Sequence, residues 1–284
     1  MKASDASVRG RQARKGKSAY AGPRAPVRVM QIVEALAEAP EGVSLALLAE
    51  RLAIPKTSLL NHLRVMVSTG HVALQDARYV LGPSAIRLGI IIAAGSTALA
   101  SMGQLARRLA DDSDETTLIA MLDEGSQQAV YISVLEGRQQ FRYSPAVGTR
   151  RPLYSTAVGR ALLAFQDEAY IRTYLAETKI ERFNARTVTD RGRLTKILGQ
   201  VRAERLALTS GEHTEGLDGI ASPVFGRNGQ VRYAIGLGIP SARAALDRKR
   251  LSRLVLAAAT DASWALGARG TISEPAARHP SRRK

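Results

Sequence analysis

The sequence predicts an α+β protein in which a winged helix–turn–helix, a helical linker and a larger domain of strands and helices follow one another. Three observations predict this fold class. Residues 44–81 contain two short amphipathic helical patterns joined by a tight break, followed by two short β-rich runs. Residues 83–112 have a helical pattern that is apolar on several faces. From residue 115 onward, strand patterns alternate with helical ones and with hairpin-length turns, which indicates a largely antiparallel sheet.

The helix–turn–helix begins with a helix that ends near Glu41-Gly42 and has one apolar face, formed by Val29, Ile32, Val33 and Leu36. The apolar face of the second helix consists of Leu45, Leu48, Ala49 and Leu52. Ser44 precedes that run, where its hydroxyl can accept a bond from an unpaired backbone N–H. Pro55 can open the third helix and Gly70 can end it. The third helix should bury Leu59, Leu60, Leu63, Met66 and Val67.

A hairpin then runs through residues 71–74 and 78–81, with its turn near Asp76-Ala77. Helix–turn–helix plus hairpin is the winged-helix arrangement, which places the third helix in the DNA major groove. The polar residues on the outer side of that helix can contact bases and phosphates. With an arginine of the hairpin, the candidate DNA-binding residues are Lys56, Thr57, Ser58, Asn61, His62, Arg64 and Arg78.

The net charge of +16 is concentrated at the two ends of the chain. Residues 1–30 carry eight basic residues and one acidic residue, and residues 267–284 carry five basic residues and one acidic residue. Both ends are rich in small and polar residues without helical periodicity, so we predict disordered tails at 1–24 and 268–284. Such tails are either solvated chain or arms that add salt-sensitive phosphate contacts.

Between the tails we predict a DNA-binding domain at 25–83, a linker or dimerisation helix at 84–101 and an effector domain at 102–267. The linker could also be a solvated spacer, but apolar residues on several faces favour a homodimer or homotetramer. The chain has no cysteine, which excludes disulfides and thiolate chemistry. Its longest apolar stretch is too short to span a bilayer, and its basic N-terminus lacks a signal-peptide core, so we expect a cytoplasmic protein without a membrane partner.

In the larger domain, strands are predicted at 116–122, 129–135, 140–144, 219–225 and 231–239. Helices are predicted at 156–165, 168–177, 192–205 and 247–266. Pro223 predicts an edge or a bulge in its strand. The last strand alternates, with five large residues on one face (Val231, Tyr233, Ile235, Leu237 and Ile239) and small residues such as Gly236 and Gly238 on the other. These glycines indicate either close helix packing or a small-molecule cavity.

The segment 148–160 leads from a loop with two arginines into a helix capped by Ser155 and Thr156. Unpaired N–H groups at a helix start suit a carboxylate or phosphate, although ordinary capping explains the same pattern. No nucleophile elbow, phosphate loop or dinucleotide fingerprint is present, so we expect no enzyme activity and no cofactor. His213, in the run Glu212-His213-Thr214-Glu215, is expected to be solvated surface and not a metal ligand.

The chain resembles the IclR family of bacterial transcriptional regulators over residues 26–267. The resemblance rests on the order and spacing of six short motifs, which are residues 54–58, 68–72, 79–83, 147–152, 157–164 and 216–225. It implies a GAF-like effector domain and an oligomeric repressor or activator that binds operator DNA near catabolic genes and responds to a small organic acid. The effector-binding residues expected from the helix start and the resemblance are Ser155, Thr156, Ala157, Gly159, Gly219, Ile220, Gly236 and Gly238.

The chain departs from the family pattern at several positions. Asn61 stands where arginine is common, and Gly159-Arg160 replaces the usual Gly-Lys. Arg205 stands where similar proteins have a glycine after a helix, which costs stability if its φ is positive. Members that bind small keto acids have polar side chains at the positions of Gly219, Gly236 and Gly238, and an acidic residue near Thr209. We therefore expect a wider cavity and a larger effector, such as an aromatic acid.

Two other functions remain as alternatives to the ligand-responsive regulator. A general nucleic-acid-binding protein would depend on its basic tails and show little sequence preference. An enzyme with a GAF-like core would need a nucleophile–base pair or a metal cluster.

Overall fold

The computed structural model describes residues 24–95 and 97–268, and within these ranges it describes side chains except those of residues 93–99. The predicted tails lie outside the described residues, apart from Arg24 and Ala268. The chain divides into two compact units, residues 1–87 and 88–284. The boundary between the units falls inside a helix. Our narrower boundaries at residues 83, 101 and 267 stay a prediction.

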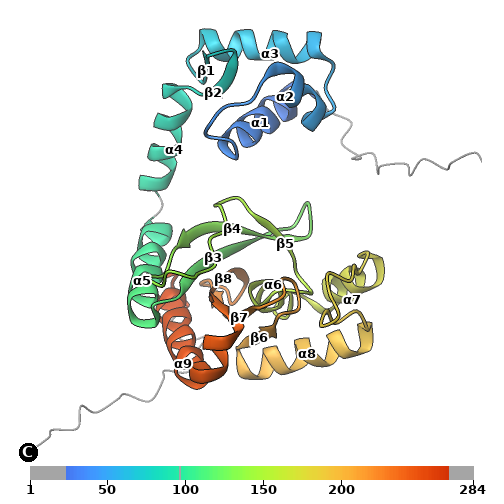
Figure 1. Cartoon of the computed structure of the whole chain (residues 1–284), viewed down its shortest axis with the longest axis vertical. Coiled ribbons are helices and arrows are strands. Elements are labelled where there is room, and N and C mark those ends of the chain that lie inside the picture. The colour runs from blue at the N-terminus through green and yellow to red at the C-terminus, as the bar shows by residue number, and fades with distance from the viewer. Residues whose placement is uncertain (1–23, 96, 269–284) are drawn as a thin grey trace, which may run out of the picture. The chain divides into compact units, whose positions relative to one another are not determined.

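The N-terminal unit is a three-helix bundle with a hairpin (Figure 1). Its elements are α1 (Arg24–Ala37), α2 (Leu45–Leu52), α3 (Lys56–Ser68), β1 (Val72–Gln75) and β2 (Arg78–Leu81). The Ser44 hydroxyl accepts a bond from the Leu47 N–H, as predicted. The core contains the residues on the predicted apolar faces, among them Ile32, Leu36, Leu48, Leu59, Leu63 and Met66. The helix–turn–helix fold is therefore confirmed.

Three details of that unit differ from the sequence prediction. Helix α1 ends at Ala37, four residues early, because Pro40 has no N–H with which to continue the helix and the Gly42 N–H bonds the Ala39 carbonyl in a turn. Pro55 precedes α3 instead of opening it. Val67 is 40% exposed, because only every third or fourth position of α3 faces the core.

The hairpin turn at Asp76-Ala77 places both residues at positive φ, +46° and +62°. This backbone favours Asp-Gly, because a Cβ in the left-handed region costs about 1 kcal/mol. We expect Ala77→Gly to stabilise the N-terminal unit by about 0.5–1 kcal/mol, measured by thermal unfolding. Ala73→Gly, in the adjacent strand, is the control and should destabilise. A loss of stability in Ala77→Gly would contradict the prediction.

The linker region forms two helices, α4 (Pro83–Gly95) and α5 (Thr97–Ser113). Five large apolar side chains of α4 are more than half exposed in the single chain: Ile86, Leu88, Ile90, Ile91 and Ile92. Helix α5 belongs to the C-terminal unit, where it packs along a second helix, α9 (Ser241–Ala265) (Figure 1). No helix of the described residues is long and apolar enough to cross a membrane.

The C-terminal unit is built on a six-stranded antiparallel sheet in the order β5-β4-β3-β8-β7-β6. The strands are β3 (Thr116–Asp123), β4 (Gln128–Leu135), β5 (Arg150–Pro152), β6 (Ala207–Ser210), β7 (Leu217–Phe225) and β8 (Val231–Pro240). The strand predicted at 140–144 is wrong, because Arg243 and Thr116 side chains bond the carbonyls of Phe141 and Tyr143 instead of a neighbouring strand. Strands β5 and β6 were not predicted, because they are too short to show a pattern.

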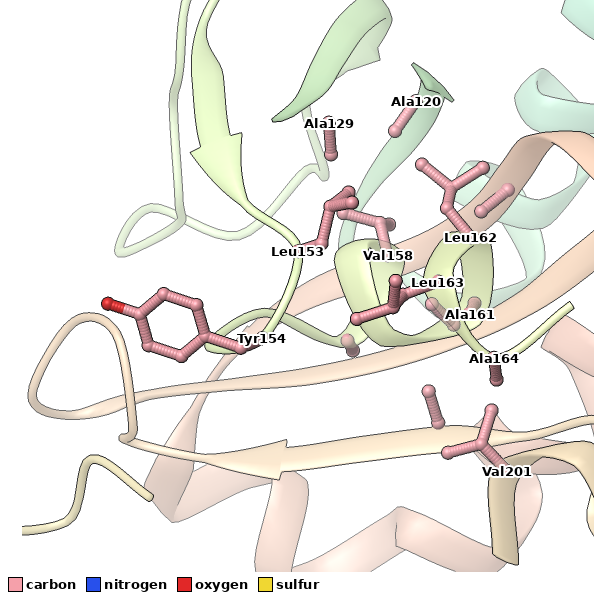
Figure 2. Close-up of a cluster of buried hydrophobic side chains, with 14 of the residues drawn as sticks. Ala120, Ala129, Leu153, Tyr154, Val158, Ala161, Leu162, Leu163, Ala164 and Val201 are labelled. Carbon is pink, nitrogen blue, oxygen red and sulfur yellow. The ribbon is translucent and has the colours of Figure 1, made fainter. Parts of the chain in front are cut away.

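Helices cover both faces of this sheet (Figure 1). Helices α5 and α9 pack on one face around Ile119, Ile235 and Leu237. The other face carries α6 (Ala157–Leu163), α7 (Glu168–Glu177) and α8 (Arg191–Glu204). All seven residues of α6 are buried, and Figure 2 shows its leucines and alanines among side chains of the strands and of α8. The fold is α+β, as predicted.

The register of β7 and the start of α9 differ from the predicted pattern, whereas Pro223 agrees with it. A register shift between Val224 and Phe225 pairs Phe225 with Val231, so Val231 joins the α6 face and not the face of Ile235. Pro223 lies beyond the part of β7 that pairs with β6, which leaves one of its sides unpaired, as its sequence predicted. Helix α9 starts at Ser241, six residues before the predicted start, and has non-helical angles at Asp247.

Candidate functional site

The outer side of α3 carries the predicted DNA-binding residues. Most are exposed on α3 or, for one arginine, on β2: Lys56, Thr57, Asn61, Arg64 and Arg78. Ser58 and His62 are half-buried. One further arginine joins this surface, because Arg28 of α1 donates from Nη1 to the Ser58 hydroxyl at 3.1 Å. Arg28 was not among the predicted residues, since nothing in the local sequence pattern relates α1 to the start of α3.

The turn between α2 and α3 is short and closely bonded. Ala53 takes the left-handed conformation, with φ +53° and ψ +40°. The Ile54 N–H then bonds the Ala49 carbonyl at 3.1 Å. This turn fixes the direction of α3 relative to α2, which is what a helix–turn–helix needs in order to present the start of α3 to a groove.

The second candidate site is a cavity of about 40 Å³ in the C-terminal unit. Five of the eight predicted effector-binding residues line it: Ser155, Thr156, Ala157, Gly219 and Gly238. The Thr156 hydroxyl accepts a bond from the Gly159 N–H at 3.2 Å, so it caps α6 as predicted. Strands β7 and β8 and the start of α6 thus meet at one place.

The structure does not bring the other three residues into the cavity. A Cβ on Gly159 would lie 2.6 Å from the Leu153 backbone, so this glycine allows a close turn. Ile220 points to the opposite face of the sheet, against α5 and α9. A Cβ on Gly236 would lie 2.5 Å from the Ile220 carbonyl oxygen. These positions serve packing.

The expectation that the glycines widen the cavity is wrong for this structure. The space beside Gly219 is taken by Thr209 Oγ1 and Ala157 Cβ, which lie 2.7 and 2.9 Å from where its Cβ would be. The space beside Gly238 is taken by the Tyr143 ring, whose Cδ1 lies 2.6 Å from the corresponding point. Neighbouring side chains have filled the room that the missing side chains left.

Arg151 is the arginine that lines the cavity. Its Nε is buried without a hydrogen-bond partner, and Nη2 bonds the Tyr143 hydroxyl at 3.3 Å. The guanidinium lies 6.0 Å from the centre of the Tyr131 ring. No carboxylate of the described residues lies within 4.0 Å of it. A half-buried guanidinium with a buried, unused N–H suits an anionic ligand.

The two acidic residues near the cavity are already neutralised. Asp218 accepts bonds from Ser210, Ser241 and Arg248, the last at 3.1 Å. Glu212 is paired with the fully buried Arg160, whose Nη1 donates to Oε1 at 2.9 Å. Their charges therefore do not balance Arg151.

The sequence showed two arginines in segment 148–160 without distinguishing them. Only the fold shows that Arg151 lines the cavity while its neighbour Arg150 is exposed.

His213 also lies in the cavity, and the expectation that it is solvated surface is wrong. Its Nδ1 lies 3.1 Å from the Ser155 hydroxyl, and its ring packs against Phe183 at 4.3 Å between centroids. Burial, together with the charge of Arg151, lowers the pKa of His213 to about 4. His213 is drawn away from the surface because the Arg160–Glu212 ion pair, next to it in the chain, holds the loop before β7 against α6.

A serine bonded to a histidine invites comparison with a nucleophile–base pair. A histidine with a pKa near 4 is a weak base at neutral pH, and no carboxylate among the described residues bonds its ring. The described residues also contain no cluster of three metal-ligating side chains. The geometry therefore favours binding over catalysis.

The lowered pKa of His213 makes stability depend on pH. The unfolded histidine takes up a proton near pH 6.5, whereas the folded one does so only near pH 4. Stability from this group is therefore complete above pH 6.5 and is lost as the pH falls toward 4. In urea unfolding between pH 7 and 4.5, His213→Asn should lose less stability than the unaltered protein. Equal losses would contradict the assignment.

Comparisons with known proteins agree on one family. The model of the IclR helix-turn-helix domain matches residues 25–76, and that of the bacterial transcriptional regulator IclR C-terminal domain matches residues 96–264. The HTH-type transcriptional regulator KdgR of Escherichia coli K12 is 31% identical over 78% of this chain and 84% of its own length.

Two solved structures share the fold. The IclR transcriptional regulator from Alicyclobacillus acidocaldarius has 24% identity and a TM-score of 0.80, covering 87% of this chain and 100% of that one. An IclR homologue from Microbacterium hydrocarbonoxydans, complexed with 4-hydroxybenzoate, has 22% identity and a TM-score of 0.73. It covers 85% of this chain and 98% of the other.

Proposed function

Because the chain belongs to the IclR family of bacterial transcriptional regulators, we propose that it binds operator DNA through α3 and the hairpin, and that a small organic acid in the cavity controls this binding. The observation that carries the DNA part is the row of exposed polar residues on α3, which begins with Lys56, Thr57 and Asn61. The start of such a helix goes deepest into the major groove. Asn61 can then bond adenine at two points, and Lys56 can contact guanine or phosphate.

The test is binding of the full chain to its own upstream intergenic DNA, against scrambled DNA, across a salt series. Asn61→Ala should reduce the difference in binding free energy between the upstream DNA and the scrambled DNA by about 1–3 kcal/mol. Glu50→Ala, at an exposed position of α2 rather than α3, is the control and should leave the discrimination between the two DNAs unchanged. Deleting residues 1–24 and 270–284 should weaken binding to all sequences alike. If instead the deletion abolishes binding and the unaltered protein never discriminates, the alternative of a tail-driven nucleic-acid-binding protein is correct.

The effector part rests on the unpaired Nε of Arg151. A carboxylate placed there could also bond the Ser155 hydroxyl and the neutral His213. The first N–H groups of α6, at Ala157 and Val158, lie at the same place and have no partner within the helix. Apolar residues line much of the remainder, including Leu118, Val158 and Leu217, which suits an aromatic ring. We choose 4-hydroxybenzoate as the first probe because a structural relative was crystallised with it.

The exposed isoleucines of α4 support a homodimer or homotetramer. Ile90, Ile91 and Ile92 are each at least 60% exposed in the single chain. Contiguous apolar surface of this kind marks an interaction site. Sedimentation of the full chain should therefore show an oligomer, and Ile91→Glu should shift it toward the monomer. A monomeric unaltered protein would refute this part.

A further inference from the structure

The Tyr143 ring occupies space that a ligand of Arg151 would need. It lies directly on the β8 backbone at Gly238, and its hydroxyl takes one Nη2 bond of Arg151. The cavity left beside it measures about 40 Å³, whereas small-molecule sites usually measure about 300–1,000 Å³. An aromatic acid can therefore enter only if the ring leaves. Since Tyr143 belongs to a loop and to no helix or strand, its side chain can move without breaking the sheet.

The loop that carries Tyr143 is bound closely to the C-terminal end of α5. A Cβ on Gly137 would lie 2.3 Å from the Asp114 carbonyl oxygen, so the two backbones touch. Arg138 donates from Nε to Asp114 Oδ1 and from Nη2 to the Asp111 carbonyl, both at 3.0 Å. The loop therefore holds one of the last carbonyls of α5 and the residue that follows the helix.

Two more side chains connect the Tyr143 end of the loop to the residues that follow α5. The Thr116 hydroxyl donates to the Tyr143 carbonyl at 2.5 Å. Arg243 of α9 holds both oxygens of Glu115, at 2.6 and 2.8 Å, and donates from Nη2 to the Phe141 carbonyl at 2.9 Å. Glu115 is 4% exposed, so its carboxylate is shielded from water, whereas the Arg243 side chain is 30% exposed. A shift of residues 141–143 thus changes contacts made by residues 115 and 116, which directly follow the part of the chain that Arg138 holds.

We propose that Tyr143 is a plug which the effector displaces, and that residues 136–144 carry this displacement to the C-terminal end of α5. The proposal rests on the proposed function and names the regulation of the same site. The two states are the ring on Gly238 with its hydroxyl on Arg151, and the ring withdrawn with a carboxylate in its place. In the chain, the DNA-binding unit and α4 directly precede α5. A change at the C-terminal end of α5 can therefore pass along this helix toward the DNA-binding unit.

The first test needs no ligand. Hydrogen exchange of the full chain is measured at the amides of residues 110–113 and 136–138 in Tyr143→Ala. Gly238→Ala displaces the same ring by the opposite means, by adding a methyl group beneath it. Both variants should exchange at least about threefold faster at these amides than the unaltered protein. Phe141→Ala, in the same loop but 75% exposed, is the control and should exchange like the unaltered protein. Unchanged exchange in both Tyr143→Ala and Gly238→Ala would overturn the proposal.

The second test is calorimetric titration with 4-hydroxybenzoate. If the plug covers the site most of the time, removing it should tighten binding by roughly tenfold in Tyr143→Ala. Weaker binding in that variant would make Tyr143 a ligand contact and refute the plug. If no variant binds the acid, the proposed effector class is wrong, and the exchange result alone decides whether Tyr143 is coupled to α5.

Discussion

Arg151→Gln should weaken the binding of 4-hydroxybenzoate by roughly 10- to 100-fold. The Nε of Arg151 is buried without a partner, and no other described cation in the cavity is free to replace it. A hydrogen bond to a charged group is worth about 1.5–3 kcal/mol, which corresponds to this loss in affinity. Isothermal titration calorimetry of the full chain measures it directly.

Arg150→Gln provides a control at the neighbouring position. Arg150 is paired with Asp123 at the exposed edge of the sheet and does not line the cavity. Its loss should leave acid binding within about twofold, because an exposed ion pair contributes little. Equal effects of the two substitutions would mean that general charge, and not the cavity, attracts the acid. Unaltered binding in Arg151→Gln would remove Arg151 from the site.

Arg160→Met should destabilise the C-terminal unit by about 3–5 kcal/mol. Arg160 is 1% exposed and bonds the Tyr154 carbonyl at 2.8 Å as well as both oxygens of Glu212. The substitution leaves a carboxylate that is 13% exposed without a counter-charge, which is the costly way to break a buried pair. Urea unfolding at pH 7 measures the loss.

Two further variants show whether the buried charge is responsible. Adding Glu212→Gln to Arg160→Met should recover much of the lost stability, because it removes the unpaired charge. Arg172→Met breaks an ion pair with Glu168 in which both side chains are more than 70% exposed, and should change stability by less than about 0.5 kcal/mol. A loss below 1 kcal/mol in Arg160→Met would contradict the structural role of the pair.

Arg205 shows a departure in the sequence that the structure explains. Its φ is +53°, the left-handed value for which similar proteins use glycine, so the expected strain is present. Its guanidinium lies 5.6 Å from the centre of the Phe225 ring, and its carbonyl accepts a bond from Ser222. These contacts offset part of the strain, because a cation over an aromatic ring contributes about 0.5–1 kcal/mol.

The sequence by itself determined the helix–turn–helix, the α+β class and most of the elements. These follow from local periodicity: the faces of Leu59, Leu63 and Met66, and the cap at Ser44, lie within a few residues of the features that they explain. Helix α7 was predicted at its observed bounds for the same reason. The predictions of short elements and loop ends were wrong, because distant partners determine the conformation of strand β5 and of the segment 140–144.

Only the tertiary structure decided the content of the cavity. Tyr143, Arg151, Ser155, His213 and Gly238 come from four segments, of which only 148–160 carried a local signal, and the sheet order brings them together. The glycines that predicted a wide cavity instead lie against a tyrosine ring and a threonine hydroxyl. Space in a folded protein is shared among all neighbours, so a missing side chain at one position is filled from another. For this reason the sequence could indicate where the site lies, and only the fold could show what fills it.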